Sequence, residues 1–119
     1  MSQGFVYFIA PEAALHRTSA KLVKIGFTRG NPLSRLQALQ TGSPVHLKLW
    51  AYIDGSEELE RAFHNTFAEL RSHGEWFYIE FKLEQLLHSF GEEPYIGNHI
   101  KPEQLEVSLF DNVFSRCLP

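Results

Sequence analysis

Apolar residues occur in three short runs in the first half of the chain, and these runs predict β-strands. They cover residues 5–9, 22–27 and 45–53. Runs of this length, rich in β-branched and aromatic residues and bounded by Pro, Gly or Asn, are typical of strands. We expect the first two runs to pair antiparallel and all three to share one central sheet.

Polar positions and capping residues predict helices around these strands. Asn31 followed by Pro32 is a favoured helix start, because Asn accepts a backbone hydrogen bond and Pro suits the first helical position. Ser56 is expected to cap a longer helix that runs to about residue 71. Residues 76–79 are expected to form a short fourth strand or an extended edge, and a last helix is expected over residues 82–90. The pattern therefore predicts an α+β fold with a small three-stranded central sheet flanked by helices.

Composition indicates one folded domain of a protein that works inside the cell. The 119 residues are 44% hydrophobic and 13% aromatic, which is typical of a globular chain with one core. No apolar run approaches the roughly 18 residues that cross a bilayer, and no export signal is evident. Cys117 is the single cysteine, so no internal disulfide can form, and we expect a cytoplasmic location.

The net charge of −3 hides an uneven distribution along the chain. Residues 1–55 contain six basic and two acidic side chains, whereas residues 56–119 contain five basic and twelve acidic ones. Positive charge that attracts phosphate is therefore concentrated in the first half. The alternative is that the asymmetry reflects only solvated helix faces.

Five short motifs follow one another in a fixed order. They read GFVY at residues 4–7, KIGFT at 24–28, a lone arginine at 35, LERAFH at 59–64 and GEWF at 74–77. This series resembles the GIY-YIG nuclease superfamily, and in particular its meiotically-up-regulated-gene branch, in which the second motif usually reads KIG. The resemblance covers roughly residues 4–80.

The resemblance implies a divalent-metal-dependent endonuclease that hydrolyses DNA phosphodiester bonds with Mg²⁺, for which Mn²⁺ can substitute. Residues 1–90 would form the nuclease domain, and residues 91–119 would form an extension that packs on this domain, on a second copy in a homodimer, or on a partner protein. The alternative is a non-catalytic nucleic-acid or protein-binding module on the same fold. Leu39, which stands where many relatives have histidine, and the acidic second half favour this alternative.

The resemblance also assigns catalytic roles to three residues of the first half. Tyr7 would act as general base toward a water or position it, and Lys24 would hold a phosphate oxygen or stabilise the Tyr7 phenolate. Arg35 carries a permanent, forked positive charge that suits a phosphoryl oxygen. Without the companion motifs, these residues read as a core aromatic, a surface lysine and a solvated helix arginine.

The remaining candidates are one metal ligand and several substrate contacts. Glu60 matches the metal-binding glutamate of the superfamily, and one carboxylate with waters and phosphate is sufficient for Mg²⁺. His64, one helical turn later, would orient Glu60 or donate to a phosphate. The expected substrate-binding residues are Thr28, Arg29 and Glu75. The alternative for Glu60 is an exposed helix carboxylate paired with a neighbour.

Overall fold

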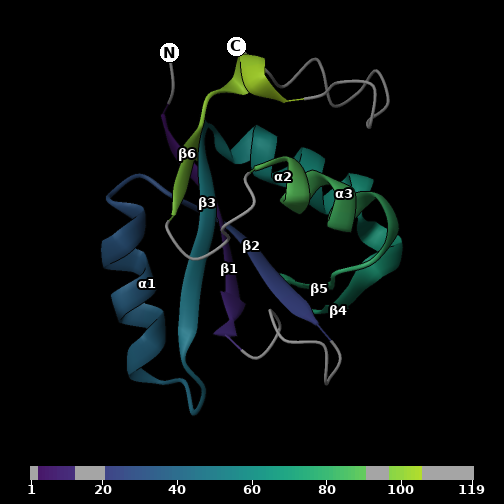
Figure 1. Ribbon diagram of the computed structural model, residues 1–119. Coiled ribbons are helices and arrows are strands. Elements are labelled where there is room, and N and C mark those ends of the chain that lie inside the picture. The colour runs from purple at the N-terminus through teal and green to yellow at the C-terminus, as the bar shows by residue number, and fades with distance from the viewer. Residues whose placement is uncertain (1–2, 13–20, 91–96, 106–119) are drawn as a thin grey trace.

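The computed structural model describes residues 3–12, 21–90 and 97–105, and shows an α+β fold (Figure 1). The strands are β1 (Gly4–Pro11), β2 (Leu22–Thr28), β3 (Leu47–Gly55), β4 (Arg71–His73), β5 (Trp76–Tyr78) and β6 (Asn98–Ile100). The helices are α1 (Pro32–Thr41), α2 (Glu57–Thr66) and α3 (Phe81–Ser89). The α+β class is confirmed. The expected three-stranded sheet is wrong, because the described part of the chain forms a six-stranded mixed sheet.

The three predicted strands lie at the centre of this sheet, whose order is β4-β5-β2-β1-β3-β6. Neighbouring strands are antiparallel except β3 and β6, which are parallel. In this register Tyr7 lies opposite Gly26 on β2 and opposite Tyr52 on β3. Cross-strand partners share one face of a sheet, so these three positions face the same side.

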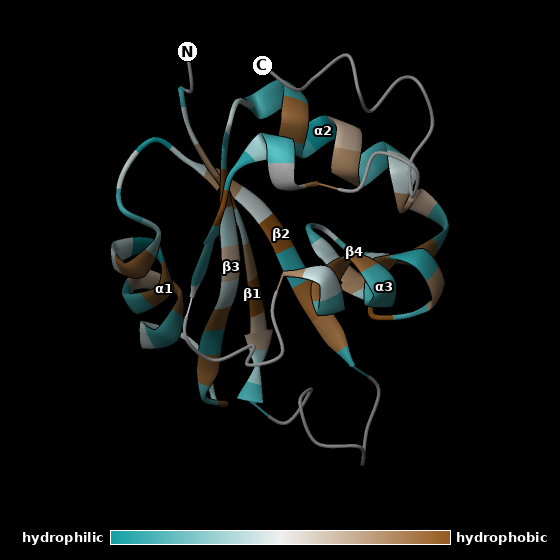
Figure 2. Ribbon diagram, turned by 45° about the horizontal axis from the view of Figure 1, so that its top comes forward, coloured by the Kyte–Doolittle hydropathy of each residue, from teal (hydrophilic) through white to brown (hydrophobic). Residues whose placement is uncertain are grey.

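Helices cover both faces of the sheet (Figure 1). Helix α1 lies on one face, which we call the α1 face, and α2 and α3 lie on the other, so apolar strand residues are enclosed between helices (Figure 2). On the α1 face, Leu36 and Leu39 pack on a cluster of buried residues, which are Tyr7, Ile9, Leu47 and Leu49. On the opposite face the ring of Phe8 contacts the rings of Phe63 and Phe90.

Local capping explains where α1 begins and ends. The Asn31 side chain accepts the backbone N–H of Leu33 at 2.8 Å, with Pro32 at the first helical position as the sequence predicts. Gly42 is the C-cap. The same holds at the start of α2, where the Ser56 side chain accepts the backbone N–H of Leu59.

Helix α2 is shorter than the sequence predicts. It ends at Thr66, and the chain continues through the 3₁₀ helix η2 (Ala68–Leu70) into β4. Strand β5 pairs with β2 only along Leu22–Lys24, which leaves the second half of β2 without a β5 partner. Helix α2 lies along this half, where the His64 Nε2 is 2.8 Å from the Ile25 carbonyl oxygen.

Strands β4 and β6, which sequence inspection missed, are three residues each and lie at the two sides of the sheet, whereas β5 falls within residues 76–79, where a short fourth strand or an extended edge is expected. Strand β6 comes from the expected C-terminal extension and joins the main sheet beside β3, while Leu105 belongs to the core on the α2 face. The rest of this extension, including Cys117, lies outside the described residues. Within the described ranges, no helix has the length and hydrophobicity to cross a membrane.

Candidate active site

A cavity of about 440 Å³ lies where the second half of β2 meets α1 and α2. Its lining residues come from β2 and the loop after it, from both helices and from the β4–β5 turn: Phe27, Thr28, Arg29, Arg35, Glu57, Glu60 and Glu75. Polar and charged side chains thus converge from four segments. Five of the predicted site residues line this one cavity, namely Thr28, Arg29, Arg35, Glu60 and Glu75.

Tyr7 does not line this cavity but is hydrogen-bonded to Arg35, which does. The Tyr7 side chain is 1% exposed, and its hydroxyl oxygen accepts a hydrogen bond from the Arg35 Nε at 3.3 Å. This contact raises the pKa of Arg35 above its ordinary value, so the guanidinium stays charged. The bond uses Nε and leaves the two terminal amino groups of Arg35 for a ligand in the cavity.

Gly26 makes room for the Tyr7 ring. A Cβ placed at position 26 would overlap the Cζ and hydroxyl oxygen of Tyr7. The glycine of the KIG motif therefore permits the tyrosine of the first motif to lie flat across β2 and reach Arg35.

Lys24 contacts Glu75 and Trp76. Its Nζ forms an ion pair with the Glu75 Oε2 at 2.9 Å and lies 5.9 Å from the centre of the Trp76 ring. The Lys24 side chain is only 13% exposed. The cation that contacts the Tyr7 hydroxyl is Arg35, and the ammonium of Lys24 is paired with Glu75.

Among the described carboxylates, Glu60 has the pKa that departs most from its ordinary value. Burial is the main cause that raises its pKa from an ordinary 4.5 to about 7; the nearby Glu75 and Glu57 also raise it, and Lys24 and Arg61 oppose the shift. None of the ion pairs between described residues includes Glu60. The folded chain thus holds a half-buried carboxylate beside two others without a matching cation.

The other cavity residues are already paired with one another. Arg29 forms an ion pair with Glu57 at 2.9 Å, and both side chains are largely exposed. Such pairs contribute little to stability and open readily. The Thr28 hydroxyl accepts the backbone N–H of Gly30 at 3.1 Å and shapes the loop that leads to α1.

His64 lies apart from the cavity. A carbonyl oxygen only accepts, so the Nε2 of His64 must donate to the Ile25 carbonyl, and this fixes the tautomer. The ring also contacts Phe77, 5.0 Å away between ring centres. The structure therefore places His64 as a link between α2 and the edge of β2, one helical turn from Glu60.

Sequence inspection missed Glu57 and Phe27 as lining residues. Glu57 precedes Glu60 by three positions, and this helical spacing puts two side chains on the same face. Phe27 is the neighbour of Thr28, and its ring lies 5.5 Å from the Arg29 guanidinium.

The donor set suits a hard cation that keeps much of its water. Within the described ranges, no group of three or more His, Cys, Asp or Glu residues is arranged to hold a metal. Glu60 alone, with its unbalanced carboxylate, offers oxygen ligation of the kind that Mg²⁺ uses with substrate phosphate and water. A cation here would also stabilise the ionised Glu60, whose pKa is raised first by burial and then by the neighbouring carboxylates.

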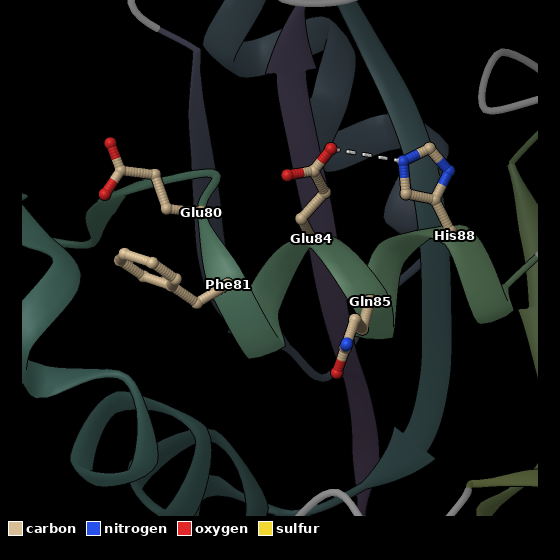
Figure 3. Close-up of a pocket in the computed structure, with 5 residues that line it drawn as sticks. All are labelled: Glu80, Phe81, Glu84, Gln85 and His88. Atoms are coloured by element: carbon tan, nitrogen blue, oxygen red, sulfur yellow. Dashed lines mark ion pairs between the residues drawn. The ribbon is translucent and has the colours of Figure 1, made fainter.

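A second depression lies on the exposed side of α3 and shows no comparable chemistry. Glu80, Phe81, Glu84, Gln85 and His88 line it (Figure 3). The Phe81 side chain is 76% exposed, and its backbone has a φ of 50°. Glu84 and His88 face each other at 3.6 Å.

Comparison with known proteins agrees with this geometry. No curated protein and no solved structure matches the chain. The family model of the T5orf172 domain matches residues 4–91, which span every residue of the cavity. The chain therefore belongs to the T5orf172 domain family, a member of the GIY-YIG nuclease clan.

Proposed function

We propose that the chain is a divalent-metal-dependent endonuclease that hydrolyses DNA phosphodiester bonds in the cavity between α1 and α2. The observation that carries this proposal is the convergence of Arg35 and Glu60 from opposite faces of the sheet on one cavity. A permanent cation and a half-buried carboxylate with a raised pKa are the groups that bind a phosphate and a metal ion. Family membership makes nuclease chemistry the first class to test.

In this mechanism Arg35 binds the phosphoryl oxygens of the scissile phosphate. Its forked terminal amino groups match two oxygens, and the charge stabilises the additional negative charge of the transition state. Tyr7 fixes the guanidinium through Nε and presents its phenolic oxygen beside it. We assign to this oxygen the orientation of the attacking water or the removal of its proton.

Glu60 holds the divalent ion, with Mg²⁺ as the expected ion and Mn²⁺ as its substitute. When bound, the ion supplies charge for the phosphoryl group and the leaving oxygen. Glu75 lies close to both Glu60 and Lys24, and its ion pair with Lys24 fixes the wall of the cavity. Thr28 and Arg29 lie where a neighbouring phosphate of the strand can bind once Arg29 leaves Glu57.

The deciding experiment is nicking of supercoiled plasmid by the purified chain with Mg²⁺ or Mn²⁺, compared with the same reaction in EDTA. Nicking that depends on the metal and is lost in Tyr7→Phe supports the proposal. Tyr7→Phe keeps the buried ring and removes only the hydroxyl that contacts Arg35.

A second candidate is a non-catalytic DNA-binding module, which one observation favours. Leu39, at the position where many superfamily members carry histidine, packs into the core under α1 and supplies no chemistry. The same plasmid experiment separates the two. Protein that shifts DNA in a gel but leaves it intact with every metal is a binding module.

A further inference from the structure

Three aromatic rings gather on the α1 face beside the cavity. Phe5 comes from β1, Tyr52 from β3 and His99 from β6, and we call these three residues the aromatic cluster. The strand register explains the grouping, because Phe5 lies opposite Asp54 and Tyr52 lies opposite His99. None of the three lines the cavity itself.

The rings pack in a defined arrangement. His99 lies parallel to Tyr52, with ring centres 4.7 Å apart and an angle of 13° between the planes. Phe5 stands edge-on to both, at 5.5 Å from Tyr52 and 6.1 Å from His99. Stacked and edge-to-face pairs at these distances are the favoured geometries for aromatic side chains.

Asp54 fixes the imidazole in this position. The His99 Nε2 lies 3.0 Å from the Asp54 Oδ1, so the ring is held by a hydrogen bond on its edge and by Tyr52 on one face. The His99 side chain nevertheless remains 42% exposed. A partly exposed histidine would ordinarily be mobile, whereas Asp54 and Tyr52 hold this one in a fixed orientation while part of its side chain remains open to solvent.

The aromatic cluster continues the row of residues that leads to the cavity. Phe5 lies opposite Thr28, a cavity residue, and Tyr7 lies between Gly26 and Tyr52 in the sheet. Adjacent strands are about 4.8 Å apart, so His99 is two strand spacings, or roughly 10 Å, from Tyr7 across the sheet. One bound nucleic-acid strand can reach both places.

We propose that His99, backed by Tyr52 and Phe5, stacks an unpaired nucleobase of the strand whose phosphate binds in the cavity. Bases inside a duplex are stacked on their own neighbours, so an aromatic platform on a protein selects bases that are unpaired or flipped out. The contact with His99 also gives the Asp54 carboxylate a hydrogen-bond partner, which reduces its repulsion of the phosphates of a bound strand. This inference deepens the proposed function and rests on its phosphate site: the substrate carries single-stranded or distorted nucleotides beside the bond that is cut.

The test measures binding in EDTA, where no cleavage takes place. The probe is a short single-stranded DNA oligomer that contains the fluorescent base aminopurine, whose emission falls when the base stacks on an aromatic ring. His99→Ala should weaken binding by about 5- to 100-fold and abolish the fluorescence change, as expected for loss of one stacked base. His99→Phe should retain most of both, because it keeps the ring.

Two comparisons make the result specific. Phe81→Ala removes another aromatic ring, which lies on α3 and is far more exposed, and should leave binding of the DNA oligomer unchanged. A fully paired duplex of the same sequence should bind the wild type and His99→Ala alike. Wild-type affinity and fluorescence change in His99→Ala would overturn the proposal. If the base stacks on His99 but the protein never nicks DNA with a metal, the stacking proposal is supported and the proposed nuclease function is contradicted.

Discussion

At the scale of single residues, the contact between Gly26 and Tyr7 determines whether the site can form. We expect Gly26→Ala to lose about 1–3 kcal/mol of unfolding free energy, the usual range for an overpacked core, because the new Cβ overlaps the Tyr7 ring. Urea unfolding measures the loss. Gly42→Ala is the matched control, since nothing lies within 4 Å of a Cβ at that position. Equal stability of Gly26→Ala and wild type would show that the ring does not lie over Gly26.

Glu60 makes a second prediction at this scale, about pH. Its pKa is raised to about 7 from 4.5, so the folded chain binds the proton more tightly than the unfolded chain. The associated stability is complete below pH 4.5 and is lost as the pH rises through about 7. Glu60→Gln removes the ionisable group and with it this loss. Above pH 7 in EDTA, we expect the unfolding free energy of the variant to exceed that of wild type by about 1–2 kcal/mol, a figure reduced for partial exposure.

The control for this measurement is Glu58→Gln, an exposed carboxylate on the same helix. Chemical unfolding at several pH values, in EDTA and then in excess Mg²⁺, gives both stability and ion binding. Below pH 4.5 the Glu60→Gln variant and wild type should be equally stable. A constant difference at every pH would contradict the assigned cause.

At the scale of elements, α2 is joined to β2 by a hydrogen bond from His64 as well as by the packing of its apolar face. We expect His64→Leu to lower the unfolding free energy by about 1–3 kcal/mol, since the partly buried Ile25 carbonyl then lacks its partner. The Glu60 carboxylate, one turn away, should be displaced, and nicking should fall with it. His88→Leu on α3 is the control, because that imidazole is exposed. Unchanged stability of His64→Leu would mean that α2 is held by its apolar face alone.

The same scale shows why some elements were predictable. The start of α1 follows from Asn31 and Pro32, whose effect is local, and the central strands follow from unbroken apolar runs. Strands β4, β5 and β6 are too short to show a periodic pattern, and they exist because a longer strand lies beside each. Helix α2 ends early because the chain must turn into β4 to reach the sheet.

The site was predictable to a similar degree. The motifs supplied five of the seven residues that line the cavity, yet they did not show that Glu75 pairs with Lys24 and that Arg35 contacts Tyr7. The pairing of Lys24 with Glu75 depends on the β4–β5 turn, which places Glu75 beside β2. His64 likewise lies on the expected face of α2 but reaches a backbone carbonyl that only the open edge of β2 provides.

At the scale of the whole molecule, charge limits how the chain can hold DNA. The net charge is −3, and the cations that line the cavity are Arg35 and Arg29, the second of which must first leave Glu57 to bind a phosphate. Two contacts predict a slope of about −2 for the logarithm of duplex affinity against the logarithm of salt concentration. Fluorescence anisotropy in EDTA measures it, and Arg29→Gln should make the slope shallower by about one. A much steeper slope would indicate a broad basic surface instead.

Helices α1 and α2, from opposite faces of the sheet, bring Arg35 and Glu60 to one cavity, which we propose to be a metal-dependent nuclease site. The most direct test is the rate of plasmid nicking in Mg²⁺ by Glu60→Gln beside Glu58→Gln, two changes of the same kind on the same helix. We predict that Glu58→Gln cuts like wild type, whereas Glu60→Gln folds normally, gains nothing from added Mg²⁺ and leaves the plasmid supercoiled. Nicking by Glu60→Gln at the wild-type rate would contradict the assignment of this cavity as the metal site.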